Sequence, residues 1–279
     1  MIDVAIATNR LTEDPDQPAL TAALSREGVC AVLAAWDDAD VDWDGFAATV
    51  IRSTWDYPLA YDEFVAWVGT VERLINPADV VAWNGDKRYL DDLAARGVPT
   101  IPTTYAHHGD EAVFPDSGFV VKPTVGGGSR GAKRFSLDEV DAARAHVDAL
   151  AAQGRLAMVQ PYVDSVTTIG ETDVVVLDGT VSHAVRKYAP INLEATAAPA
   201  GPVRVERVDP TESERACVRA ALAAVPFDAP LCFARVDLLA TELGPTVIEV
   251  ELIEPFLFLE HDAAAADALA AAIARRVRG

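Results

Sequence analysis

The stretch CFARVDLLATELGPTVIEVELIEP, residues 232–255, carries the pattern that decides the fold. Two apolar runs rich in β-branched residues flank a Gly-Pro pair, which predicts a β-hairpin. If Leu243 is near the centre of the turn, Asp237 lies directly opposite Glu249 on the neighbouring strand. Glu251 follows two residues later and therefore points to the same face. We expect three carboxylates to gather on one face of this hairpin.

Such a cluster needs a compensating charge. Like charges that face each other across strands destabilise a sheet, and burial of an unpaired carboxylate is costly. Hard oxygen ligands suit Mg²⁺, so a bound cation would point to nucleotide-phosphate chemistry. The alternative is a solvated acidic hairpin, because the same register puts Arg235 opposite Glu251 and pairs one carboxylate. The hairpin alone leaves both interpretations open.

The bulk composition indicates a globular protein. The 279 residues suffice for a large core and two or three subdomains. Hydrophobic residues make up 51% of the chain and charged residues 24%, which is not the composition of a disordered protein. No apolar run reaches the ~18 residues of a membrane helix, and the start MIDVAIAT is typical of a first strand, not of a signal peptide. We expect a cytoplasmic enzyme or binding protein without a membrane partner.

The cysteines and the net charge argue against three further classes of protein: disulfide-rich, zinc-binding and nucleic-acid-binding. Three scattered cysteines form no CxxC pair, which disfavours a disulfide framework or a zinc site. The formal net charge of −20 disfavours binding to nucleic acid, whose phosphates it would repel. An anionic ligand would therefore need a local basic site, and lysines set among apolar residues mark where that site is.

The first 83 residues are expected to form a parallel βα domain, because strand and helix signals alternate. Strands are predicted at 2–8, 29–35 and 46–51, and helices at 18–27 and 61–74. No GxGxxG follows the first strand, so a dinucleotide fingerprint is absent. Ligands of such sheets bind beyond the carboxyl ends of the strands. There, Arg52, Ser53 and Asp56 are candidates for holding the carboxylate and amine of a substrate, and an ordinary polar loop is the alternative.

Two further units follow. Residues 84–163 are expected to form a unit with helices at 87–95 and 137–153 and strands at 118–123, 133–135 and 156–163. Residues 164–279 are expected to form a mostly antiparallel unit. It begins with strands at 172–177 and 181–187 around an Asp-Gly turn. It continues with an irregular stretch at 193–207, a helix at 211–225, the carboxylate hairpin and a closing helix at 263–278. Ser136 and Thr211 are the predicted N-caps, each with a glutamate at the capping-box position.

A lysine in an apolar strand precedes a glycine-rich loop. Lys122 follows Phe-Val-Val, and burial of its ammonium group is costly unless an anion meets it. The loop GGGSRG after it exposes backbone N–H groups that can cover phosphates, with Gly127, Gly128 and Ser129 as candidate contacts. The P-loop pattern is missing. A flexible hairpin tip with a surface lysine is the alternative.

Two more segments offer nucleotide contacts. Lys87 begins a helix, where a cation opposes the helix dipole, so a bound phosphate would compensate. An ordinary exposed lysine explains it nearly as well. The run Gln160, Pro161, Tyr162 and Val163 ends an apolar strand, and its proline frees backbone groups that can hydrogen-bond an adenine ring. A strand that simply ends at proline is the alternative.

The Asp-Gly hairpin offers cations. A simple two-residue turn places Arg186 opposite Glu171, with Lys187 next along the strand. One interpretation is a cross-strand ion pair. The other is a cation aimed at a phosphoryl group in transfer, where charge develops during the reaction.

Taken in order, these motifs resemble those of the ATP-grasp superfamily. A lysine is followed by Lys-Pro with a glycine-rich loop, then QPYV, then Glu…Arg in a hairpin, then Asp…Glu-x-Glu, over about residues 84–255. The N-terminal βα unit matches the domain that usually precedes this fold. The resemblance implies an α/β (α+β) fold in which an N-terminal parallel βα domain is followed by two α+β subdomains that enclose the nucleotide.

The resemblance also implies roles for residues. It makes Lys87 and Lys122 the ATP-phosphate lysines and the segment 160–163 the adenine hinge. It makes Arg186 a contact to the reacting phosphoryl group, with Lys187 beside it as a second catalytic candidate. Asp237 and Glu249 become ligands of Mg²⁺, or of Mn²⁺ in its place. Glu251, the third metal candidate, stands where many members have Asn.

A narrower resemblance lies in IRSTWDY, NGDKRYLDDLAARGVP, VVKP, SHAVRK and ELIEPFLFLE. Together they resemble the branch that contains D-cycloserine synthetase (O-ureido-D-serine cyclo-ligase), whose setting is antibiotic biosynthesis. This implies a ligase that activates a small amino-acid-like carboxylate as an acyl phosphate for attack by an amine-type nitrogen, in another molecule or in the same one.

Two other functions are compatible with the sequence. One is a phosphotransferase that acts on an acceptor hydroxyl, and the other is a non-catalytic nucleotide-binding regulatory protein. The substrate and the oligomeric state, including a homo-oligomer, are left open.

Overall fold

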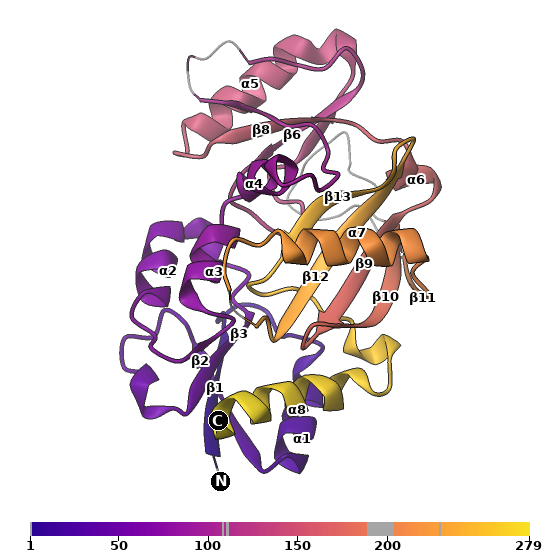
Figure 1. Cartoon of the computed structure of the whole chain (residues 1–279). Helices are drawn as coiled ribbons and strands as arrows, with labels where there is room; N and C mark the ends of the chain where they lie inside the picture. Colours follow the sequence, from indigo (N-terminus) through magenta and orange to yellow (C-terminus); the bar gives the residue numbers. More distant parts are fainter. Residues whose placement is uncertain (1, 108, 110–111, 189–203, 229) are drawn as a thin grey trace.

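Three β-sheets follow one another along the molecule. The structure is a computed structural model and describes residues 2–107, 109, 112–188, 204–228 and 230–279 of the chain. Figure 1 shows the N-terminal sheet at the bottom and the five-stranded sheet in the middle. The sheet that contains β6 and β8 lies at the top. One sheet is parallel and two are antiparallel, and helices pack on each of them. The expected α/β (α+β) fold is confirmed.

The first sheet is parallel, with strand order β2-β1-β3-β4. Its strands are β1 (Ile2–Thr8), β2 (Val29–Ala35), β3 (Ala48–Ser53) and β4 (Leu74–Ile75). The helical elements between them are α1 (Gln17–Arg26), η1 (Trp43–Gly45), η2 (Tyr57–Leu59) and α2 (Tyr61–Val68), the two η elements being 3₁₀ turns. The helix α3 (Ala78–Asn84) follows β4.

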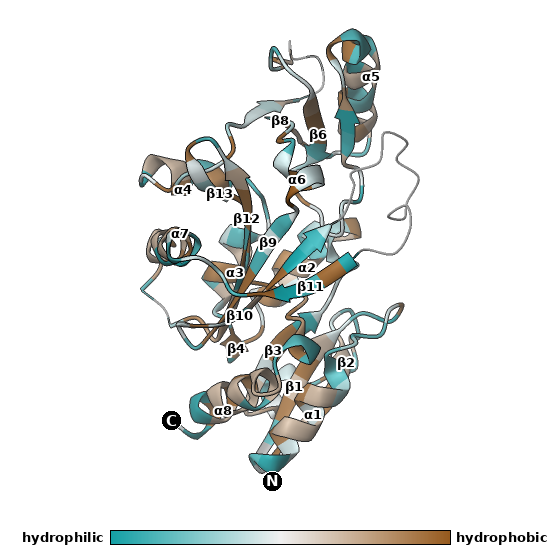
Figure 2. Ribbon diagram, turned by 90° about the vertical axis from the view of Figure 1, so that its right-hand side faces the viewer, coloured by the Kyte–Doolittle hydropathy of each residue, from teal (hydrophilic) through white to brown (hydrophobic). Residues whose placement is uncertain are grey.

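The last helix of the chain completes this first domain. α8 (Ala265–Arg278) packs beside α1 on one face of the parallel sheet. Leu20 of α1 and Leu269 and Ile273 of α8 are fully buried in one core with the strands. Figure 2 shows the hydrophobic colour of β1 and β3 next to these two helices. The closing helix therefore packs on the first sheet, although the strands that precede it belong to the third unit.

The second unit is a four-stranded antiparallel sheet of order β5-β8-β6-β7 with one helix on it. Val147 and Leu150 of the helix pack on Phe119 and Val121 of the sheet. Ser136 forms the expected capping box at the start of the helical region. The elements are α4 (Tyr89–Ala95), β5 (Thr104–Ala106), β6 (Phe119–Pro123), β7 (Lys133–Phe135), η3 (Leu137–Glu139), α5 (Val140–Ala151) and β8 (Ala157–Pro161).

The third unit is a five-stranded antiparallel sheet of order β11-β10-β9-β12-β13. Its elements are α6 (Ser165–Thr168), β9 (Glu171–Leu177), β10 (Thr180–Tyr188), β11 (Arg204–Val208), α7 (Glu212–Ala223), β12 (Phe233–Thr241), β13 (Gly244–Glu251) and η4 (Leu259–His261). Thr211 caps α7 with Glu214 in a capping box, as predicted.

The two faces of this central sheet differ. Val174, Val236 and Val250 belong to the core beneath α7. On the other face, Val175 and Phe233 pack into the core shared with the first domain. Further along the same strands that face carries charged residues. Because side chains alternate between faces, one strand can supply apolar groups to both cores and end in charge.

The register of the β9–β10 hairpin differs from the expected one. A bulge between Val181 and His183 shifts the pairing by one residue. Lys187, and not Arg186, therefore stands opposite Glu171. The prediction for Arg186 was wrong because a bulge adds one residue to one strand and reverses every later side chain.

Other boundaries also differ. The helix predicted over residues 61–74 ends at Val68, because Gly69 follows as its C-cap and residues 74–75 join the parallel sheet. Residues 204–208, predicted as irregular, form the edge strand β11, while 193–203 lie outside the described residues. The short elements α3, β5 and α6 were not predicted. None of the helices in the described ranges is long and apolar enough to cross a membrane.

Buried amide groups fix the carboxylate hairpin to the rest of the fold. Asn76 donates to the carbonyls of Phe233 and Leu252, at 2.9 Å each. Asn84 donates to the carbonyl of Val250 at 2.8 Å and accepts from the N–H of Leu252. Buried polar groups left unpaired would be costly, so these bonds define one position for the end of β13.

We expect His183 to make folding pH-dependent. Its Nε2 donates to the carbonyl of Leu257 at 2.9 Å, and burial lowers the pKa of this histidine from its ordinary 6.5. The unfolded chain then binds the proton more tightly, so stability decreases as pH falls below about 6.5. Calorimetry from pH 7 to 5 should give a smaller decrease of Tm for His183→Gln than for the unmodified protein. Equal decreases would contradict this expectation.

Candidate functional site

A cavity of about 180 Å³ lies between the second unit and the charged half of the central sheet. Its lining comes from β6, the glycine-rich loop, β8 and the strands β9, β10, β12 and β13. The residues predicted from sequence that line it are Lys87, Lys122, Gly127, Gly128, Ser129, Gln160, Pro161, Tyr162, Val163, Lys187, Asp237, Glu249 and Glu251. Segments up to 164 residues apart in the sequence thus meet in one site.

The hairpin at residues 233–251 has the expected register. Asp237 pairs with Glu249, and Arg235 pairs with Glu251. Asp237, Glu249 and Glu251 offer carboxylate oxygens that all lie within 4.8 Å of one another. This cluster has the oxygen donors that a divalent cation prefers.

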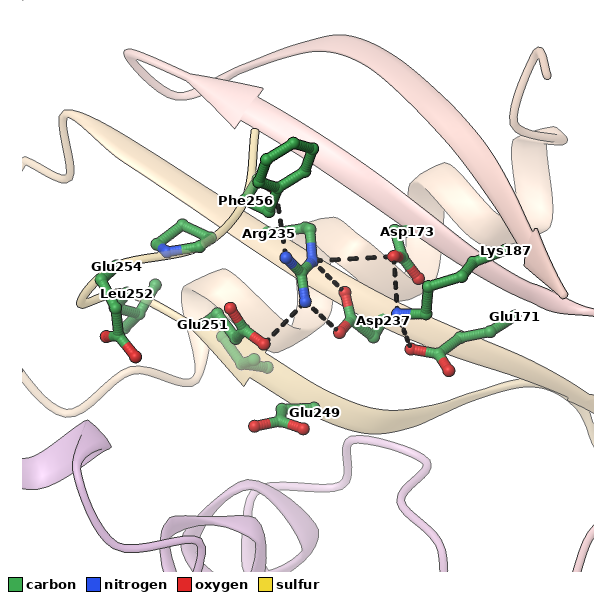
Figure 3. Close-up of polar contacts among 12 residues, drawn as sticks. Glu171, Asp173, Lys187, Arg235, Asp237, Glu249, Glu251, Leu252, Glu254 and Phe256 are labelled. Carbon is green, nitrogen blue, oxygen red and sulfur yellow. Dashed lines mark hydrogen bonds and ion pairs between the residues drawn. The ribbon is translucent and has the colours of Figure 1, made fainter. Parts of the chain in front are cut away.

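Arg235 lies among these carboxylates (Figure 3). Its Nε and Nη2 donate to Asp237 at 2.7 and 2.8 Å, and Nη2 also donates to Oε1 of Glu251 at 2.6 Å. Nη1 donates to the carbonyl of Phe256 at 3.0 Å. The guanidinium is therefore held on several sides at the cavity wall.

Crowding of carboxylates shifts their pKa values. Burial raises the pKa of Glu251 to about 7 against the opposing effect of Arg235, and Glu249 and Asp237 raise it further. Burial and the Glu251 charge raise the pKa of Glu254 to about 8. For Asp237 burial acts in the same sense, but the Arg235 guanidinium reverses it and the pKa is lowered. A further positive charge would favour the ionised form of each group.

A second set of charges lies deeper on the same face. Lys187 Nζ is 3.0 Å from Glu171 and 2.9 Å from Asp173. Asp173 is fully buried, and burial together with the Asp237 charge raises its pKa well above the usual range. Arg235 Nε also lies 3.9 Å from Asp173. Asp173 thus lies within ion-pair distance of both Lys187 and Arg235, two of the cations that line the cavity.

The two lysines that come from the second unit differ in their partners. Lys87 Nζ lies 3.0 Å from Glu249 and also donates to the carbonyl of Gly126. Burial alone would lower the pKa of Lys87, but Glu249 raises it. Lys122 has no carboxylate within ion-pair distance among the residues that the structure describes. Burial lowers its pKa despite the Glu249 charge, and the adjacent Lys87 lowers it too. A bound anion would stabilise the charged form of Lys122.

The glycine-rich loop closes one side of the cavity. Gly128 and Ser129 have φ values of 60° and 59°, a conformation that suits glycine and is strained for serine. Arg130 donates to the carbonyl of Trp55 in the first domain, and Arg155 donates to the carbonyl of Val125 at 2.8 Å. The loop therefore spans from the second unit to the first domain.

The segment expected to read an adenine ring remains largely within the sheet. Gln160 and Pro161 pair with β6, and the Gln160 side chain donates to Thr103 Oγ1 at 2.9 Å. The N–H of Tyr162 donates to the carbonyl of Gly118 at 2.7 Å, and the guanidinium of Arg134 lies 3.5 Å from the centre of the tyrosine ring. Val163 completes this part of the lining.

Four predicted site residues do not line this cavity. Arg186 points to the α7 side of the sheet, 3.0 Å from Thr172 Oγ1 and 3.7 Å from Glu214. Ser53 is buried at the end of β3, where its carbonyl accepts from the N–H of Asn9. The other two, Arg52 and Asp56, have different roles in the fold.

Arg52 joins the first domain to the C-terminal segment. It is fully buried, lies 3.5 Å from Asp14 and 3.7 Å from Asp16, and donates to the carbonyl of Pro255 at 3.0 Å. Asp16 in turn accepts from the N–H groups of Leu257 and Leu259. Asp56 accepts from the indole N–H of Trp36 at 2.9 Å and lines a different cavity.

The sequence analysis missed part of the site. It treated Arg235 only as the partner of Glu251, although the two-residue spacing before Asp237 already put it on the same face. Glu171 was treated only as an ion-pair partner, and Asp173 was not considered. Glu171 and Asp173 are two residues apart on β9, so the sequence already places them on one face of the sheet. Their pairing with Lys187 could not be predicted, because it depends on the bulge in β10.

Comparisons with known proteins show the family to which this chain belongs. Residues 4–76 match the family model described as the N-terminal domain of D-cycloserine synthetase DcsG. The chain is 40% identical over 284 residues to the cycloserine biosynthesis protein DcsG of Streptomyces lavendulae, covering 95% of each. The chain belongs to the D-cycloserine synthetase family.

Solved structures extend this result to the fold. A crystal structure of D-cycloserine synthetase DcsG superposes with a TM-score of 0.90 at 38% identity, covering 99% of both chains. The D-alanine–D-alanine ligase of Bacillus anthracis, solved with ATP, gives a TM-score of 0.71 at 14% identity over 100% of this chain and 98% of that one. This member of the D-cycloserine synthetase family has the ATP-grasp fold and is a ligase.

We expect Arg52→Met to reduce stability and not to act on substrate binding. Loss of the guanidinium leaves Asp14 and Asp16 buried without their cation, at a cost of about 3–5 kcal/mol. Arg26→Met removes an exposed pair with Asp267 and should cost at most about 1 kcal/mol. Denaturant unfolding compares the two variants. An Arg52→Met protein of unchanged stability with a raised KM for an amino-acid substrate would return Arg52 to the substrate site.

Proposed function

We propose that this ligase uses ATP and Mg²⁺ to activate the carboxylate of a small amino-acid-like substrate as an acyl phosphate. A nitrogen of the same molecule then closes a ring, as the name of the D-cycloserine synthetase branch implies. The observation that carries the proposal is one cavity lined by cations from two units of the fold. Lys87 and Lys122 come from the second unit, and Lys187 and Arg235 come from the central sheet.

This arrangement supports phosphoryl transfer to an acceptor within the cavity. Phosphoryl transfer depends mainly on positioning and on stabilising negative charge, and it needs no covalent protein intermediate. Lys122, which lacks a carboxylate partner in the described structure, would meet a phosphate. Arg235, fixed by Asp237 and Glu251, would stabilise charge on the transferred group. Arg235 takes the role first expected of Arg186, which lies on the opposite face of the sheet.

The donor set of the hairpin fits a divalent cation. Asp237, Glu249 and Glu251 would hold Mg²⁺, and Mn²⁺ accepts the same oxygen ligands. Bound Mg²⁺ neutralises charge on the nucleotide phosphates. Arg235 and Lys87 hold these carboxylates in place for that ion.

The chemistry balances in two steps. An oxygen of the substrate carboxylate attacks the γ-phosphorus of ATP, and the bond to the bridging oxygen breaks to release ADP. The substrate nitrogen then attacks the acyl carbon of the resulting acyl phosphate and loses its proton. The acyl carbon–oxygen bond breaks, and phosphate leaves with one oxygen of the original carboxylate.

The loop contact with the first domain supports protection of this intermediate. An acyl phosphate hydrolyses if water reaches it, so the site must exclude water. Arg130 of the glycine-rich loop donates to the carbonyl of Trp55, whose indole donates to the carbonyl of Glu254 at 3.1 Å. Loop, first domain and hairpin end are thus joined beside the cavity.

We expect Lys122→Met to reduce ADP release by about 100-fold or more, because it removes a charge aimed at a phosphate. Lys133→Met, on the paired strand β7 but outside the cavity lining, is the matched control. A coupled assay for ADP with O-ureido-D-serine as substrate measures both variants, and circular dichroism checks folding. Unchanged ADP release in Lys122→Met would exclude this phosphate site.

Labelled oxygen tests the acyl phosphate. O-ureido-D-serine with ¹⁸O in its carboxylate should give phosphate that carries one ¹⁸O atom, detected by mass spectrometry. A phosphotransferase that acts on a hydroxyl would release a phosphorylated product and no free phosphate. Free phosphate without ¹⁸O would overturn the acyl phosphate and would leave the ligase assignment unchanged.

A further inference from the structure

A second cavity lies in the first domain, away from the ligase site. Its volume is about 630 Å³, and it shares no lining residue with the first cavity. It is bordered by the segments that follow β2 and β3 and by α2. Ligands of parallel sheets bind beyond the carboxyl ends of the strands, and this cavity has that position.

The walls are aromatic. Trp36, Trp43 and Trp67 all line the cavity. The ring centres of Trp43 and Trp67 are 5.1 Å apart, and those of Trp36 and Trp67 are 6.0 Å apart. Tryptophan faces attract cations more strongly than other side-chain rings do.

The charged residues that line this cavity are acidic. Asp37, Asp38, Asp56 and Glu63 line the cavity, and its described lining contains no lysine, arginine or histidine. The nearby cation is Arg10, which lies 3.0 Å from Asp37 and 3.3 Å from Asp38. One arginine beside four carboxylates leaves an excess of negative charge, so the cavity favours a positively charged ligand.

The mouth is apolar. Leu11 is 80% exposed and Leu59 is 76% exposed, and both line this cavity. Single exposed leucines are common, but two at the rim of one aromatic cavity form a surface that a small organic ligand can cover. An inorganic cation would not use this apolar surface.

We infer that this cavity binds a small organic ammonium ion. The tryptophan rings would contact the alkylated or protonated nitrogen, the carboxylates would supply the opposite charge, and the leucines would cover the carbon groups. Two sources share this chemistry: a second molecule of the amino-acid substrate, bound apart from the ligase site, and an unrelated amine that acts as an effector. Asp56, expected from sequence to hold an amine, is part of this lining.

Choline and its uncharged carbon analogue 3,3-dimethylbutan-1-ol test the inference. The five tryptophans give separate indole N–H signals in NMR spectra, and Trp55 and Trp83 do not line the cavity. Choline should shift the signals of Trp36, Trp43 and Trp67 and leave the other two in place. The uncharged analogue should bind about tenfold more weakly, the factor that one cation–π contact of moderate strength gives.

Two adjacent residues of α2 give a matched pair of variants. Glu63 lines the cavity and Asp62 does not, so Glu63→Gln should weaken choline binding several-fold more than Asp62→Asn. Arg10→Gln removes the competing cation and should strengthen binding. Equal affinity for choline and the analogue, equal effects of the two α2 variants, or shifts at Trp83 instead would overturn the inference.

A competition experiment separates the two sources. Saturating O-ureido-D-serine that displaces choline assigns the cavity to a second molecule of the substrate, an interpretation that rests on the proposed function. Binding of choline that the substrate does not affect assigns it to a separate amine. Because choline binding is measured without ATP or turnover, failure of the ligase proposal and failure of this site are distinguishable.

Discussion

The contact on which the site depends is the guanidinium of Arg235 among three carboxylates. It bonds to Asp237 and Glu251 and lies near Asp173 at a position where each of these groups is largely buried. Without it, like charges would repel one another in a medium that screens poorly. The hairpin therefore keeps its acidic face only because a cation from the same strand is part of it.

The central sheet makes this contact compatible with a stable fold. Both faces of its strands are apolar over much of their length, toward α7 on one side and toward α1 and α8 on the other. Lys187, Arg235 and Asp237 lie where these strands line the cavity. The same alternation places Lys187 with the acidic group and Arg186 outside it. A shift of one residue in β10 thus decides which cation enters the cavity.

The sequence predicted the carboxylate hairpin from its two apolar runs and the turn between them, although the observed pairing of Asp237 with Glu249 also includes a bulge after Asp237. The parallel domain also followed from alternating strand and helix signals. Lys187 and Arg186 were exchanged because a bulge leaves no mark in the hydrophobic pattern. Arg52 was expected to contact a substrate because its position at the end of a strand does not reveal that it lies near Asp14 and Asp16. Long-range packing of this kind depends on the tertiary structure and not on local residues.

The packing of α8 on the parallel sheet has a consequence for the newly made chain. The first sheet is complete after residue 75, but α8, which packs beside α1 on this sheet, is translated about 190 residues later. Until then Leu20 and Leu24 of α1 have only part of their core. During synthesis the first domain therefore exposes apolar surface, and it becomes fully folded only when the C-terminal helix packs on it.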